Sequence, residues 1–67
     1  MSVAKVIEIT AESDKGFEDA IRKGIKKASE SIDHIRAAWV ANQEVVVDGS
    51  TVKAYRVHMR VTFVLND

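Results

Sequence analysis

The clearest chemical signal in the chain is a set of basic side chains at alternate positions, Arg56, His58 and Arg60. A period of two is the period of a β-strand, so these side chains share one face of a predicted strand. Positive groups this close repel one another unless anions lie among them. Two sources of anions stay open: carboxylates of another subunit, or phosphate groups of a ligand, which arginine binds in bidentate fashion.

Trp39 is the only tryptophan in the chain. The predicted strand pairing, described below, places it opposite Arg60. Its indole then anchors a subunit interface, forms a cation–π contact with Arg60, or offers a stacking surface to a flat aromatic ligand. The residue types alone leave these alternatives open.

Catalytic motifs are absent from the sequence, which contains no glycine-rich phosphate loop, no cysteine nucleophile and no carboxylate pair at a recognisable spacing. His34, beside Asp33, is interpreted as a helix-end or surface histidine rather than a metal ligand. We therefore expect a protein that is not an enzyme.

The amino-acid composition argues against several further classes of protein and binding site. The chain has no cysteine, hence no disulfide and no thiolate metal site, and its two histidines argue against structural zinc. Ten basic and ten acidic residues balance, which indicates neither a nucleic-acid nor a membrane partner. No apolar run has the length of a signal peptide or a membrane span, so we expect a cytoplasmic protein.

A long hairpin over residues 35–65 must position the basic side chains. Its second half alternates strictly, with an apolar residue at every second position: Tyr55, Val57, Met59, Val61, Phe63 and Leu65. Asp48-Gly49-Ser50-Thr51 is predicted to be the turn, with glycine at positive φ. The resulting register pairs Val47 with Val52. It also pairs Val40 with Met59 and Ala38 with Val61 on one face, and Trp39 with Arg60, Ala37 with Thr62, Ala41 with His58 and Gln43 with Arg56 on the other.

The N-terminal half supplies one more strand and a helix. Residues 3–9 are rich in valine and isoleucine and predict a strand, and residues 10–15 predict a polar connection in which Ser13 and Asp14 are turn or N-cap candidates. A helical stripe follows that ends near Asp33: Phe17, Ala20, Ile21, Ile25, Ala28 and Ile32. Pairs of Glu18 with Arg22 and Asp19 with Lys23 are expected on its surface, and Gly24 is expected to allow close packing.

These elements predict an α+β fold of order β-α-β-β, a single domain over residues 1–67. The last strand lies in the middle of a three-stranded antiparallel sheet that wraps around one helix on its apolar face. A chain of 67 residues buries a modest core, and both outer strands leave open edges. Self-association is therefore expected.

Three stretches in this order, KVIEIT, GFEDAIRKGIKKASESIDHIR and YRVHMRVTFVL, resemble the dodecin family over Lys5 to Leu65. The resemblance implies the same β-α-β-β fold and a hollow homododecamer. It also implies storage of a flavin, FMN or riboflavin, at subunit interfaces. In that arrangement a tryptophan stacks on the flavin ring and a glutamine of the last strand hydrogen-bonds it.

Two positions depart from this pattern. Ala37 occupies the position of the family tryptophan, with Trp39 two residues further along, and Arg56 occupies the position of the glutamine. The alternative is therefore a flavin-free shell that binds a cation or another anionic cofactor, or that is structural only. The predicted ligand-binding residues are Ala37, Trp39, Arg56, His58 and Arg60.

Overall fold

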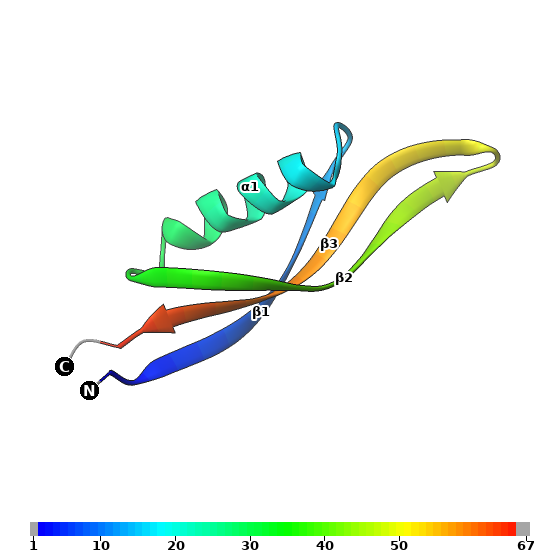
Figure 1. Ribbon diagram of the computed structural model, residues 1–67. Helices are drawn as coiled ribbons and strands as arrows, with labels where there is room; N and C mark the ends of the chain where they lie inside the picture. The colour runs from blue at the N-terminus through cyan, green and yellow to red at the C-terminus, as the bar shows by residue number, and fades with distance from the viewer. Residues whose placement is uncertain (1, 66–67) are drawn as a thin grey trace.

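The computed structural model of the chain describes residues 2–65 and contains the four predicted elements in the predicted order (Figure 1). They are β1 (Ala4–Ser13), α1 (Phe17–Ser29), β2 (Ile35–Asp48) and β3 (Thr51–Val64). The strands form one antiparallel sheet of order β1-β3-β2, and α1 packs over one face, mainly against β1 and β3. This confirms the predicted fold class and topology.

Strand β1 is longer than predicted, because its alternation continues past residue 9 to Ser13. The buried Ser13 then closes the connection to the helix: its hydroxyl accepts a hydrogen bond from the Lys15 backbone N–H at 3.0 Å and donates one to the Asp19 carboxylate. That donated bond is the main reason why the pKa of Asp19 is lowered. Ser13 is thus the last residue of β1 and holds the turn that follows it, while the N-cap position is Gly16.

The core lies between α1 and the middle of the sheet. Val57, Val61 and Ala20 are fully buried and Met59 is 1% exposed, so the predicted apolar face of the last strand is confirmed where it lies under the helix. Partly buried side chains of α1, β1 and β2 complete this core: Ile7, Ile9, Ala11, Phe17, Ile21, Ile25, Ile35 and Val40. Leu65, by contrast, lies just beyond β3 and is exposed.

Gly24 sits where the helix comes closest to the sheet. A Cβ atom at this position would lie 2.9 Å from the Ala11 Cβ and 2.9 Å from the Met59 Cε. Carbon atoms normally approach to about 3.5–4.0 Å. The absence of a side chain therefore sets the spacing between α1 and β1, as the sequence predicted.

The predicted hairpin register is correct next to the turn and from Val40 to Ala37, and wrong between these two regions. A further irregularity between Ala37 and Ile35 shifts the register again at the start of β2. The pairs Val47–Val52, Val40–Met59, Trp39–Arg60, Ala38–Val61 and Ala37–Thr62 are all present. The predicted pairs Ala41–His58 and Gln43–Arg56 are wrong, since His58 pairs with Asn42 and Arg56 with Glu44.

Two irregularities explain the error. β3 has one extra residue between the Val47 and Val46 pairs, and β2 has one extra residue between the Val40 and Asn42 pairs. Each bulge shifts the register by one residue, and the second cancels the first. Between them every side chain of β2 is on the opposite face from the one predicted.

The hairpin extends well beyond the helix. α1 has 13 residues and is therefore about 20 Å long, whereas the 14 residues of β2 or β3 span about 46 Å. The molecule measures 50 Å along its longest axis, and Figure 1 shows the β2–β3 turn projecting past the start of the helix. We call residues 44–55 the arm. Within residues 2–65, no helix is long and apolar enough to cross a membrane.

Candidate functional site

The face of the sheet opposite α1, which we call the open face, carries the polar side chains. Arg56, His58 and Arg60 alternate with the buried core residues of β3 and so point away from the helix. The pairing of β1 sets Glu8 opposite Arg60, Thr10 opposite His58 and Glu12 opposite Arg56. Directly paired residues share a face, so all three strands contribute polar groups to the same surface.

At one end of the open face, Arg60 joins Glu8 to Trp39. Its guanidinium carbon lies 4.8 Å from the centroid of the Trp39 ring, and its Nε donates to Glu8 Oε1 at 3.4 Å. The cation–π contact anticipated for Trp39 is therefore present. Trp39 remains 61% exposed, so most of its ring surface is open to a further contact.

At the other end, Arg56 and His58 share carboxylates of their own chain. Arg56 forms an ion pair with Glu12 and a longer one, 3.5 Å, with Glu44. Glu44 Oε1 also accepts from His58 Nε2 at 2.7 Å, and His58 Nδ1 lies 3.1 Å from the Thr10 hydroxyl. In the neutral ring Nδ1 is then the acceptor, because Nε2 donates to the carboxylate.

These contacts change the ionisation of the cluster. The hydrogen bond from His58 and the positive charge of Arg56 lower the pKa of Glu44. The hydrogen bond to Glu12, together with its negative charge, raises the pKa of Arg56. All four groups are at least one-third exposed, so the network orients side chains more than it stabilises the fold.

The source of the anions was not identified from the sequence. The sequence predicted carboxylates of another subunit or phosphates of a ligand, whereas in the structure Glu8, Glu12 and Glu44 of the same chain lie among the basic groups. The sequence does indicate the face on which Glu8 and Glu12 lie. They alternate along β1 with Ile7, Ile9 and Ala11, which point to the helix, and so lie on the other face of the sheet. The face of Glu44 is not indicated in this way, because the bulges decide it.

The structure places the five predicted site residues on one face but in two groups. Trp39 meets Arg60, and Ala37 lies two residues before Trp39 on the same strand. Arg56 and His58 belong to the carboxylate cluster, and Arg56 is four residues from Arg60, or about 13 Å along the strand. Ligand binding by these five residues remains a prediction.

A hollow of about 280 Å³ lies between the two groups. Residues of all three strands line it, including the bulge in β2: Glu8, Ile9, Thr10, Ala41, Asn42, His58, Met59 and Arg60. Trp39 does not line this hollow. No group of three or more histidine, aspartate or glutamate side chains within residues 2–65 is placed to hold a metal ion.

The sequence and the fold both match known proteins. The family model described as Dodecin matches residues 3–66. The chain is 38% identical to the calcium dodecin of Mycobacterium tuberculosis over 63 residues, which are 94% of this chain and 89% of that protein.

Solved structures agree with this assignment. An arginine-to-alanine variant of the dodecin from T. thermophilus is 27% identical, with a TM-score of 0.93 over the whole of both chains. The crystal structure of the M. tuberculosis calcium dodecin, which its authors describe as calcium chelating with a novel calcium-binding site, is 35% identical with a TM-score of 0.85. There the match covers 97% of this chain and 93% of the other. The chain described here belongs to the dodecin family.

Proposed function

We propose that copies of this chain assemble into a hollow homododecamer that binds and stores a small ligand on the open face, with flavin as the first candidate. Dodecins bind small ligands, so family membership supports the general role. The observation that carries the flavin proposal is the exposed ring of Trp39 beside Arg60. An aromatic ring stacked on a tryptophan gains on the order of 1–3 kcal/mol in comparable sites.

The proposed mechanism is sequestration without catalysis. Arg60 lies over one side of the Trp39 ring, so a flat ligand stacks on the other side or takes the place of the guanidinium. A second copy of the chain would close the site, because the open face of a single chain is exposed. The polar groups nearby hold one another in ion pairs and hydrogen bonds, and we assign none of them a chemical step.

Flavin binding is tested by the quenching of FMN or riboflavin fluorescence on titration with the protein. We expect quenching by the native protein, loss of quenching in Trp39→Ala, and partial quenching in Trp39→Phe, which keeps a ring. Sedimentation of each variant must first show a particle of about twelve times the 7.4 kDa chain mass. The flavin proposal is wrong if the intact assembly leaves both flavins fluorescent and Ala37→Trp creates quenching.

A second candidate ligand is a divalent cation. It is favoured by the 38% identity to a protein named calcium dodecin. Within residues 2–65 no three acidic side chains are placed to hold a metal ion, so such a site would combine carboxylates of two or more copies. Calorimetric titration with calcium chloride tests it, with magnesium chloride as the comparison. Calcium binding that disappears in Glu44→Gln, in a protein that leaves flavin fluorescence unchanged, would support the cation over the flavin.

A further inference from the structure

The arm carries an apolar strip that continues the helix-covered face of the sheet. Tyr55 marks this face, because its ring meets that of Phe17 at 5.2 Å in an edge-to-face contact. Val45 pairs with Tyr55, and Val47, two residues on, pairs with Val52. Paired residues share a face, so Val45, Val47 and Val52 lie on the same side as the helix.

This strip has no cover within the described chain. Val45, Val47 and Val52 are 42%, 54% and 46% exposed. The helix starts at Phe17, which reaches only as far as Tyr55, and the arm continues beyond it (Figure 1). Valines grouped on one side of a projecting hairpin are typical of a surface that is buried by a partner.

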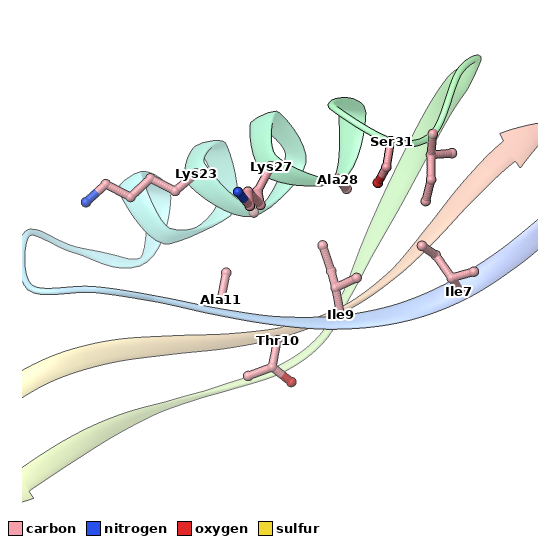
Figure 2. A pocket seen from close by; sticks show the side chains of 10 residues that line it. Ile7, Ile9, Thr10, Ala11, Lys23, Lys27, Ala28 and Ser31 are labelled. Carbon is pink, nitrogen blue, oxygen red and sulfur yellow. The ribbon is translucent and has the colours of Figure 1, made fainter.

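A second uncovered apolar surface lies at the side of the molecule, in a groove of about 530 Å³ between α1 and β1. Figure 2 shows Ile7, Ile9 and Ala11 pointing from the strand toward the helix, with Ala28 on the helix opposite them. Ile32 also lines the groove. The groove runs along β1, an outer strand of the sheet whose second edge pairs with no strand within residues 2–65.

The arm of a chain cannot fill the groove of the same chain. β2 and β3 run without interruption from the sheet into the arm, and the arm leads away from the helix (Figure 1). The two surfaces can therefore meet only between copies. Lys23 and Lys27 line the groove and pair there with Asp19 at 3.3 Å and Glu30 at 3.4 Å. Asp48 at the tip of the arm is highly exposed and lies 3.9 Å from Lys53, so docking brings a further carboxylate to these two lysines.

We propose that the arm of one copy docks in the α1–β1 groove of a second copy, with Val45, Val47 and Val52 against the isoleucines of the groove. Each copy has one arm and one groove, so the contact is head-to-tail and closes into a ring when the rotation between copies allows. The inference rests on the proposed assembly and names the surfaces that form it.

Cross-linking tests the contact directly, because the chain has no cysteine of its own. Val47→Cys chains and Ala28→Cys chains are refolded together and treated with a short bismaleimide. We expect a cross-linked band of two-chain mass that neither variant forms alone. The matched control replaces Ala28→Cys with Lys26→Cys, an exposed helix position outside the groove, and should form several-fold less of the band.

Val47→Asp supplies a second measurement. The charge lies at the exposed end of the arm, so the chain should still fold, with native circular dichroism, but sediment as a smaller particle than the native protein. The inference is overturned if the native protein assembles, the groove mixture gives no more of the band than the control, and Val47→Asp keeps the native sedimentation. If the native protein itself sediments as a single chain, the proposed assembly fails together with this contact.

Discussion

Replacement of Gly24 by alanine tests how closely the helix packs on the sheet. In an exposed helix interior this change stabilises a protein by about 1 kcal/mol, because alanine is the better helix former. Here the new methyl group would lie 2.9 Å from the Ala11 Cβ, which is fixed to the backbone of β1. It would also lie 2.9 Å from the Met59 Cε, which is flexible but has little free space because Met59 is buried.

The two effects oppose each other, and the packing effect is the larger. Adding a methyl group to a filled core costs about 1–3 kcal/mol, so Gly24→Ala should lower the free energy of unfolding by about 1 kcal/mol after the helix gain is subtracted. The measurement is urea unfolding followed by circular dichroism, at one protein concentration for all variants because assembly contributes to stability.

A double-mutant cycle isolates the contact. In the Ala11→Gly background one of the two obstructing atoms is gone and the Met59 Cε remains, so Gly24→Ala should cost about 1 kcal/mol less than in the native background. The reasoning is refuted if Gly24→Ala stabilises the native protein by the full helix-propensity gain. The groove between α1 and β1 would then be able to widen at no cost.

Two further predictions concern the backbone and the acidic cluster. His34 has a positive φ of 65°, and its carbonyl accepts a hydrogen bond from the backbone N–H of Val64. A β-branched residue is strained at this φ, so His34→Val should destabilise the protein by about 1–2 kcal/mol, whereas His34→Gly should keep a thermal unfolding midpoint close to the native one. Equal effects of the two variants would contradict this. The pKa of Glu44 is lowered in the folded state, so the unfolded chain binds more protons below pH of about 4.5 and stability falls as the pH falls through that range. Melting temperatures between neutral and acidic pH should therefore fall less steeply in Glu44→Gln than in the native protein, and parallel curves would show that Glu44 is not the group responsible.

The sequence by itself determined the elements and the way they pack. The apolar series of β3 repeats every two residues and predicts a strand, and the apolar stripe of α1 repeats every three or four residues and predicts a helix. Each element then has one apolar face, and both faces are buried when the helix packs on the sheet. The turn at Gly49 and Ser50 then placed Trp39 opposite Arg60, and the residues quoted for the dodecin resemblance were sufficient to identify the family.

Only the tertiary structure decided which groups meet on the open face. The two bulges on either side of Glu44 cancel, so the register from Val40 to Ala37 and the register next to the turn are both as predicted, and neither the turn nor the apolar pattern reveals the bulges. Between them they bring Glu44 rather than Gln43 to Arg56. For Glu8 and Glu12 the alternation of β1 indicates the face, but not the partner, because Arg60 and Arg56 lie more than forty residues away along the chain. Local patterns record which face a side chain prefers, whereas the partner it finds there depends on strand pairing across the whole sheet.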